Sequence, residues 1–309
     1  MTQNNLGTTL SELAGRKEGQ VKQDLLDQAV RAFKLALDIR TRSALPQQWA
    51  TTQHNLGAAL IEQGIRTGGA EGQQLLRQAV AAYRAALEVR TKESLAPQWA
   101  QTHNNLAEAS MALGDWEQVV TSYRNVLELY PEYQDAYLNM NAVLHEQLFR
   151  FAEAFALNEQ WIQAHPEDEA AKMNFAEAHL TTGHFDEAEQ RFAKLLSGTD
   201  LDAQATIPLS LLNVISLIAQ NKRDVASEQL KKISVSLRTQ PEDFSLSWSF
   251  EGTKHFIGQD EAFASSREWL LKLLDEFSGK MRNDMLEEVE AAQARFAAVN
   301  SPSGASIQQ

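Results

Sequence analysis

The stretch TTQHNLGAAL, residues 51–60, is written almost unchanged twice more in the same chain. MTQNNLGTTL occupies residues 1–10 and QTHNNLAEAS residues 101–110, so each copy begins fifty residues after the previous one. A second segment keeps the same period, because QAVRAFKLALDIRTRSALPQQWA at 28–50 returns as QAVAAYRAALEVRTKESLAPQWA at 78–100. Self-similarity at a fixed period is typical of repeat architectures, in which each unit packs on its neighbours. We therefore expect one elongated repeat array and not two ordinary domains.

The composition favours helices along this array. Hydrophobic residues make up 43% of the 309 residues, which is enough to bury apolar faces throughout. Glycine (15 residues) and proline (7 residues) are sparse, so intrinsic propensity favours helix almost everywhere. Apolar residues recur at helical spacing in the second helix of each fifty-residue copy: Leu25, Val30, Phe33 and Leu37, then Leu75, Val80, Tyr83 and Leu87. The sequence predicts an all-α fold.

The charge is strongly acidic and unevenly distributed. The formal net charge is -13; residues 1–130 hold 13 Lys and Arg against 13 Asp and Glu, whereas residues 131–309 hold 15 against 28. Carboxylates in excess repel a phosphate backbone and an anionic bilayer, so we expect neither a nucleic-acid nor a membrane partner. A protein or peptide partner of neutral to basic character fits this charge better.

Several features of the sequence limit where the protein can be located and which chemical activities it can have. The chain has no cysteine, which excludes disulfides and thiolate metal sites. The N-terminus has no signal-peptide pattern and no apolar run approaches about 18 residues, so we expect a soluble cytoplasmic protein. The seven histidines show no short metal-ligand spacing, and no phosphate loop or nucleophile–base motif is found. We therefore expect no cofactor, no metal site and no enzymatic activity.

The segment AQTHNNLAEASMALGDWEQVVTSYRNVLELYPEY, residues 100–133, resembles the tetratricopeptide repeat. Its matching positions are Leu106 and Ala107 on the first helix, the turn Gly114–Trp116, the packing set Val119, Tyr123 and Val126 on the second helix, and Pro131 at the end. A second unit ends at Pro166, and a third, AAKMNFAEAHLTTGHFDEAEQRFAKLL at 170–196, shows the same turn and packing set. The two longer N-terminal copies look like the extended repeats of kinesin light chains and of many bacterial multi-domain proteins.

This resemblance implies a right-handed solenoid of helical hairpins, a tetratricopeptide-type alpha-alpha superhelix with the first helices lining the concave side. We divide it into extended repeats at 1–97, three regular units at 98–200, divergent hairpins with a capping helix at 201–298, and a disordered tail at 299–309. Beyond residue 200 the helices rest on periodicity alone. The expected ranges are 205–220, 223–238, 243–257, 260–277 and a last helix near 281–298. We expect this last helix to bury Met285, Val289 and Phe296 and to expose Glu287, Glu288 and Glu290 to solvent.

One polar residue recurs on the first helices. Asparagine stands at the same repeat position as Asn5, Asn55, Asn105, Asn139 and Asn174. The resemblance implies that this position faces the groove, and a carboxamide can hydrogen-bond the peptide groups of an extended ligand whatever its sequence. The alternative is that these asparagines only tie adjacent helices together. The neighbouring groove candidates are Asn4, His54 and Asn104 one residue earlier, and Glu108 and Glu177 three residues later.

The sequence thus predicts a non-enzymatic protein–protein interaction scaffold, which binds an extended peptide or a partner domain in its concave groove. Because Met1 falls inside a repeat, we also expect the chain to be a fragment or a fused module of something longer. The alternative function is a regulatory or sensor module of a larger bacterial effector, such as a caspase-like peptidase system, since arrays with this wording are often fused to such domains. The groove lacks the basic residues with which chaperone adaptors hold a terminal carboxylate, so we expect no binding to acidic chaperone tails.

Overall fold

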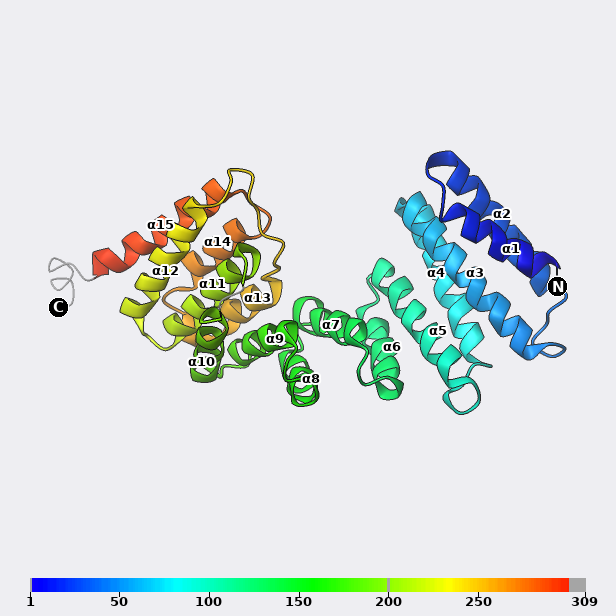
Figure 1. The fold of residues 1–309 in the computed structure, drawn as a ribbon, viewed down its shortest axis with the longest axis horizontal. Coiled ribbons are helices and arrows are strands. Elements are labelled where there is room, and N and C mark those ends of the chain that lie inside the picture. Colours follow the sequence, from blue (N-terminus) through cyan, green and yellow to red (C-terminus); the bar gives the residue numbers. More distant parts are fainter. Residues whose placement is uncertain (1, 199–200, 300–309) are drawn as a thin grey trace. The chain divides into compact units, whose positions relative to one another are not determined.

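The computed structural model describes residues 2–198 and 201–299 and confirms the all-α fold (Figure 1). Its α-helices are α1 (Thr2–Ala14), α2 (Gly19–Leu37), α3 (Pro46–Thr67), α4 (Gly69–Leu87), α5 (Lys92–Leu113), α6 (Trp116–Leu129), α7 (Gln134–Ala142), α8 (Phe151–Ala164), α9 (Glu169–Leu180), α10 (Phe185–Leu196), α11 (Ala203–Ala219), α12 (Arg223–Arg238), α13 (Glu251–Gln259), α14 (Arg267–Phe277) and α15 (Arg282–Val299). A π-helical turn, η1 (Val143–Gln147), continues α7, and a 3₁₀ turn, η2 (Glu261–Phe263), follows α13.

Two compact units make up the chain, an N-terminal unit, Met1–Val143, and a C-terminal unit, Leu144–Gln309. The boundary between them falls inside the segment 98–200, which the repeat pattern predicts as three regular units. Compactness and repeat length divide the chain by different criteria, so the predicted segments stay a prediction.

The NLG motif packs the first helix of a hairpin against the second. In the N-terminal unit α1 packs on α2 and α3 packs on α4. A Cβ atom on Gly7 would lie 2.7 Å from the ring of Phe33, and one on Gly57 would lie 2.8 Å from the ring of Tyr83. Such close approach of a helix backbone to an aromatic ring requires glycine. The decapeptide therefore recurs because the same close helix–helix contact recurs.

The first predicted tetratricopeptide unit has the local structure that its sequence indicates. Gly114 ends α5 with φ +75°, a left-handed conformation that glycine adopts without strain. The Asp115 carboxylate then accepts a hydrogen bond from the backbone N–H of Gln118 and caps α6. Val119, Tyr123 and Val126 are buried, which confirms the predicted packing set.

Helix α11 is the centre of the C-terminal unit. Every residue from Ile207 to Ile218 is buried, and α9, α10, α12 and η2 contact the helix. A helix that is apolar on all sides must be enclosed by others. The leucines and the phenylalanine of α14 belong to the same core.

The predicted helix at 243–257 is wrong over its first half. Only Glu251–Gln259 is helical, and the preceding residues form an extended strap with one β-bridge between Ser245 and Met281. The sequence FSLSWSF at 244–250 alternates apolar and polar residues, a period of two that suits an extended chain with one buried face. Leu246 and Phe250 are buried while the serines between them are exposed, so this alternation was the overlooked indication.

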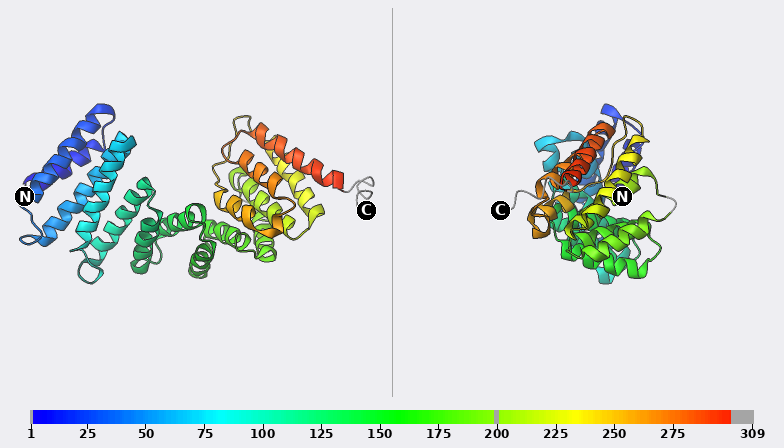
Figure 2. Two further views of the ribbon diagram at one scale, coloured as in Figure 1. Left: turned by 180° about the vertical axis from the view of Figure 1, so that it is seen from behind. Right: turned by 90° about the vertical axis from the view of Figure 1, so that its left-hand side faces the viewer.

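Helix α15 lies alongside α12 and also contacts α14 (Figure 2). Met285, Val289 and Phe296 are buried, as predicted for a terminal helix that hides one face. Glu288 does not lie on the wet face as expected, since it is buried and its carboxylate accepts a hydrogen bond from Lys272 at 2.5 Å. The expected disordered tail begins at residue 299, and residues 300–309 lie outside the described part of the chain.

Candidate functional site

A buried polar tie joins the first two hairpins of the N-terminal unit. The hydroxyl of Thr52 on α3 accepts a hydrogen bond from Arg40 Nη1 at 3.0 Å and donates toward Asn4 Oδ1 on α1, also at 3.0 Å. Thr52 is fully buried, and Arg40 and Asn4 are nearly so. Buried polar groups are costly unless paired, so the tie satisfies three groups at once.

The same tie returns fifty residues later. Thr102 on α5 accepts a hydrogen bond from Arg90 Nη1 at 3.0 Å, and its hydroxyl lies 3.2 Å from His54 Nδ1. His54 takes the place that Asn4 has in the previous copy. Burial and, to a smaller extent, the positive charge of Arg90 lower the pKa of His54 to about 4. The imidazole is therefore neutral at pH 7 and serves as an uncharged member of the tie.

This geometry argues against two of the predicted groove residues, Asn4 and His54. Asn4 is 8% exposed and His54 is 7% exposed, and their polar atoms face the buried threonines. A side chain enclosed in this way has little surface to offer a ligand. For these two residues the alternative interpretation holds, because they tie adjacent helices together.

The repeated asparagines one position later are more accessible. Asn5 is exposed, and Asn55, Asn105, Asn139 and Asn174 are half-buried on α3, α5, α7 and α9. Asn5, Asn55 and Asn174 form no side-chain hydrogen bond with another described residue, so their carboxamides can still pair with a ligand. We call Asn5, Asn55, Asn105 and Asn139, the four members in the N-terminal unit, the asparagine row. Asn174 lies in the other unit and is considered apart from them.

Two members of the row have partners within the chain. Asn105 Nδ2 lies 3.4 Å from His54 Nε2, a long contact. Asn139 hydrogen-bonds the hydroxyl of Tyr123, whose pKa burial raises to about 12. Beside the row, Asn104 Nδ2 donates to Glu108 Oε1 at 3.0 Å across one turn of α5. Asn104 is half-buried and Glu108 exposed, so the structure brings this predicted pair together at the surface.

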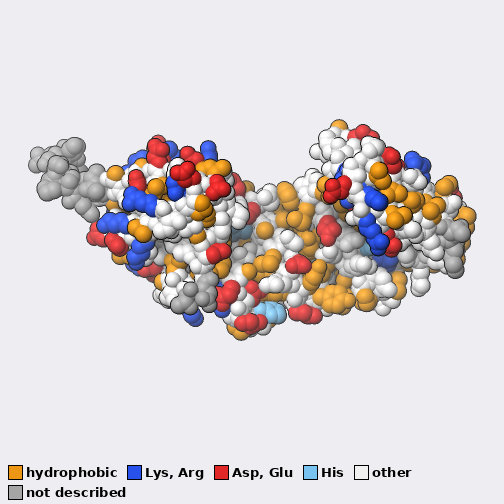
Figure 3. All heavy atoms as spheres, turned by 45° about the horizontal axis from the view of Figure 1, so that its top comes forward, with side chains coloured by type: hydrophobic (Ala, Val, Ile, Leu, Met, Phe, Trp, Pro, Cys, Tyr) orange, Lys and Arg blue, Asp and Glu red, His pale blue; other side chains and the backbone are white. Residues whose placement is uncertain are grey.

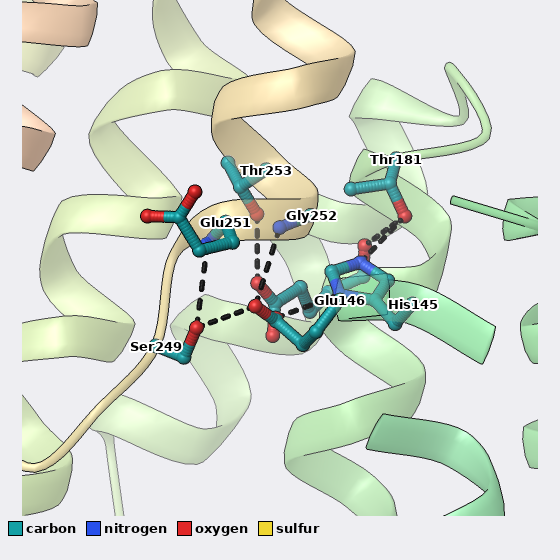
Figure 4. A network of polar contacts seen from close by, with 8 residues as sticks. His145, Glu146, Thr181, Ser249, Glu251, Gly252 and Thr253 are labelled. Atoms are coloured by element: carbon teal, nitrogen blue, oxygen red, sulfur yellow. Dashed lines mark hydrogen bonds and ion pairs between the residues drawn. The ribbon is translucent and has the colours of Figure 1, made fainter. Parts of the chain in front are cut away.

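The remaining groove candidate, Glu177, belongs to a different place. It is buried in the C-terminal unit, where it meets His145 and Glu146 of η1. Figure 4 labels these two residues and their partners Ser249 and Gly252. Three hydrogen bonds hold the carboxylates of this histidine–glutamate centre. Glu177 Oε1 accepts from Thr253 Oγ1 at 2.7 Å, and Glu146 Oε2 accepts from Ser249 Oγ and from the backbone N–H of Gly252. The prediction that Glu177 lines the groove is therefore withdrawn.

The imidazole of His145 lies between two partners in this centre. Nδ1 is 3.1 Å from Glu146 Oε1, and Nε2 is 3.2 Å from Thr181 Oγ1. Burial acts to lower the pKa of His145, but the charges of Glu177 and Glu146 outweigh it and hold that pKa above its usual range. Burial raises the pKa of the Glu177 carboxyl, whereas for Glu146 burial is outweighed by its hydrogen bonds, so that its pKa is lowered.

Local backbone structure makes this convergence possible. The π-helical turn of η1 changes the angular spacing between successive side chains, and His145 and Glu146 meet although they are adjacent in sequence. Phe149 then adopts φ +53°, a conformation that needs support, and its ring stacks on His255 of α13 at 3.8 Å. A Cβ on Gly252 would overlap the imidazole, so glycine lets α13 approach the centre.

Charged side chains are mixed on the surface of the C-terminal unit. On the face drawn in Figure 3, acidic and basic side chains are interspersed over this unit and do not form a patch of one sign. Acidic side chains of this unit form ion pairs, as half-buried Glu189 does with Lys222 at 2.6 Å and exposed Glu290 with Arg238 at 2.6 Å. No helix among the described residues combines the length and the apolar character that a membrane crossing requires.

Two family models, both described as tetratricopeptide repeat, match the chain at residues 102–137 and 145–206. These matches cover the same hairpins that the sequence pattern indicates. The chain contains tetratricopeptide repeats in these segments. The extended repeats before residue 102 lie outside both matches, so their resemblance to kinesin light chains stays an expectation.

Solved structures resemble this chain in fold. A tetratricopeptide repeat protein from Parabacteroides merdae is 19% identical, covering 93% of this chain and 99% of that one, with a TM-score of 0.50. MamA from Desulfovibrio magneticus RS-1 is 19% identical over 61% of this chain and 97% of its own, with a TM-score of 0.47. YrrB, described as having an unusual peptide-binding site, is 18% identical over 68% of this chain and 95% of its own, with a TM-score of 0.47. No curated protein sequence matches significantly.

Sequence reasoning missed the histidine–glutamate centre of this repeat protein. Glu177 follows His145 by 32 residues, and Thr253 follows Glu177 by 76, so no short motif contains the group. The prediction of no metal-ligand cluster considered only spacing along the chain. The one available indication was the repeat itself, since residues about one repeat apart on successive first helices become neighbours.

Proposed function

We propose that this protein is a protein-interaction scaffold without catalytic activity, and that its asparagine row holds an extended peptide segment. The observation that carries the proposal is the accessibility of Asn55 and its repeat-equivalents, next to Asn4 and His54, which are sealed in ties. Two adjacent positions of the first helix thus have different roles. The buried position, that of Asn4 and His54, joins neighbouring helices, and the next position carries a carboxamide that a ligand can reach.

The chemistry of the row suits a backbone ligand. A carboxamide offers two N–H donors and one carbonyl acceptor without net charge, so it can pair with both groups of a peptide bond. The pair Asn104–Glu108 places a carboxylate beside the row, which favours a ligand with a basic side chain at that point. A partner of neutral to basic character fits this arrangement.

A peptide-display selection on the immobilised chain, followed by binding measurements in solution, tests the proposal. Each ligand hydrogen bond removed should cost about 0.5–1.5 kcal/mol, so the triple variant Asn55→Ala/Asn105→Ala/Asn139→Ala should weaken a selected peptide roughly 10-fold or more. The matched control removes three exposed amides of second helices, Gln28→Ala/Gln73→Ala/Gln74→Ala, and should bind like the wild type. Equal affinity of both variants for every selected peptide would refute the role of the row.

The alternative, a regulatory module of a larger effector, concerns what this scaffold is attached to. This alternative requires an effector domain that is fused to the scaffold or encoded by a neighbouring gene. Examining the gene context tests whether such a domain exists. The same peptide-binding row would then deliver a partner to that effector, so the binding experiment keeps its meaning in either case.

A further inference from the structure

We propose that the histidine–glutamate centre of the C-terminal unit, His145, Glu146 and Glu177, binds one divalent transition-metal ion of the Zn²⁺ class. One ligand atom from each of these residues lies within 4.8 Å of the others. The site is independent of the asparagine row, which belongs to the N-terminal unit. Its support comes from the hydrogen-bond pattern of the imidazole, the charge of the group and the geometry of the donors.

The hydrogen bonds of Thr181 determine which nitrogen of His145 carries a proton. The Thr181 hydroxyl donates to the backbone carbonyl of Glu177 at 3.1 Å, and a hydroxyl has only one proton to give. It must therefore accept the bond from His145, so Nε2 carries hydrogen. In a neutral ring the other nitrogen, Nδ1, then presents a lone pair to the Glu146 carboxylate at 3.1 Å.

Two acceptors cannot face each other at this distance without a cation between them. Either a proton on Nδ1 or a metal ion can fill that role. An imidazole that ligates a metal through one nitrogen while its other N–H is held by a hydrogen bond is the usual arrangement at protein metal sites. Thr181 supplies that bond, so the ring is already oriented with Nδ1 toward the Glu146 carboxylate.

The charge of the centre distinguishes the metal ion from the proton. The Glu177 carboxyl is buried and the Glu146 carboxyl is half-buried, and neither forms an ion pair with a lysine or arginine of the described residues. A divalent cation bound between the two carboxyl groups would compensate the charge of both. Because an uncompensated buried charge is costly, the divalent cation satisfies the site more fully.

The remaining oxygen atoms complete the donor set. Glu177 Oε1 is used by Thr253, and Glu146 Oε2 by Ser249 and Gly252, which hold both carboxylates in place. Glu146 Oε1 and Glu177 Oε2 accept no hydrogen bond from a described lysine, arginine or hydroxyl. One imidazole nitrogen of His145 and one carboxylate oxygen from each glutamate lie close enough together to supply one nitrogen and two oxygen ligands.

This donor set selects the class of ion. Zn²⁺ binds imidazole nitrogen and carboxylate oxygen at about 2.0–2.2 Å and takes water as a fourth ligand, whereas Mg²⁺ and Ca²⁺ prefer oxygen ligands alone. The side chains must move closer together by about 1 Å to reach a tetrahedral arrangement with these bond lengths. Glu146 is only half-buried, which leaves a route for the ion from solvent.

The experiment uses the full chain, stripped with a chelator and then dialysed against ZnCl₂. Equilibrium dialysis with elemental analysis gives stoichiometry and affinity, and MgCl₂ is the competing ion. The expected result is one Zn²⁺ per chain that excess Mg²⁺ does not displace, with at least roughly 10-fold weaker binding in Glu177→Gln, which retains an acceptor for Thr253. The matched control, His184→Asn/Glu187→Gln, removes an exposed histidine and carboxylate of the same unit and should bind like the wild type.

A second readout on the wild type does not depend on how a variant folds. Nitrogen NMR of the His145 ring should show Zn²⁺ perturbing Nδ1 while Nε2 keeps its proton. The proposal is overturned if the wild type takes up no stoichiometric Zn²⁺, or if folded Glu177→Gln binds it as tightly as the control. Zn²⁺ that leaves the His145 resonances unchanged would overturn it as well.

Discussion

The two units of this protein solve the problem of buried polar groups in different ways. The N-terminal unit contains the same arrangement twice, fifty residues apart. In each copy a buried threonine hydroxyl accepts a hydrogen bond from an arginine, Arg40 or Arg90. The C-terminal unit has one such arrangement, the histidine–glutamate centre. Its residues come from η1 and α9, and their hydrogen-bond partners come from the strap before α13 and from α13 itself. A contact between neighbouring repeats is copied when the repeat is copied, whereas a contact between distant segments is unique.

The largest effect should come from removing both copies of the threonine tie. Thr52→Val/Thr102→Val keeps the side-chain shape but leaves the buried groups of Arg40 and Arg90 without their acceptor. Each unsatisfied buried group costs about 1–3 kcal/mol, so the double variant should lose about 2–6 kcal/mol of unfolding free energy in urea titration. Thr121→Val, at an exposed position of α6, should change stability by less than about 0.5 kcal/mol. A double variant as stable as this control would show that the ties do not stabilise the unit.

Acid should weaken the second tie through His54. The pKa of His54 is about 4 in the folded chain and about 6.5 when unfolded, so the unfolded state binds more protons between these values. The stabilising contribution is complete above pH 6.5 and is lost as pH falls toward 4, by up to about 3 kcal/mol.

His54→Asn is the control, because asparagine occupies the equivalent position 4 of the first copy. Relative to this variant, the wild type should lose unfolding free energy as pH falls from 7 to 4.5. A difference that is constant over this range would mean that His54 is not buried as a neutral ring.

The centre of the other unit should be sensitive to a single methyl group. Gly252→Ala would place a Cβ within 2.6 Å of the His145 carbonyl oxygen and against its ring. Overpacking of this kind costs about 1–3 kcal/mol, measured as the loss of unfolding free energy. Gly258→Ala on the same helix meets no atom within 4 Å and should stabilise α13 by about 0.5–1 kcal/mol. Equal responses at the two glycines would contradict the close packing of α13 on the centre.

What the sequence could predict follows the same division between copied and unique contacts. The fifty-residue period, the glycine turn at Gly114 and the packing positions Val119 and Tyr123 are local or recurrent features, and the structure confirms them. The same pattern identified the positions of Asn55 and Asn105 but did not tell them from buried His54. Burial depends on how much of a helix its neighbours cover, and adjacent helix positions face directions about 100° apart.

The C-terminal unit departs from expectation where the repeat pattern ends. Helical periodicity predicts a helix at 243–257, but residues 244–250 alternate with a period of two and form an extended strap. Glu177 was assigned to the groove because its repeat position matches Glu108, yet Thr253 of α13 covers it. Such coverage arises from a segment 76 residues away, and no pattern around Glu177 contains it.

A crystal structure of the chain with a selected peptide tests the central claim, that the asparagine row presents an accessible surface for peptide backbone. The account predicts an extended peptide across α3 and α5, with the carboxamides of Asn55 and Asn105 about 2.7–3.2 Å from its backbone N–H and C=O groups. A peptide held on the second helices, with both carboxamides still facing solvent, would contradict it.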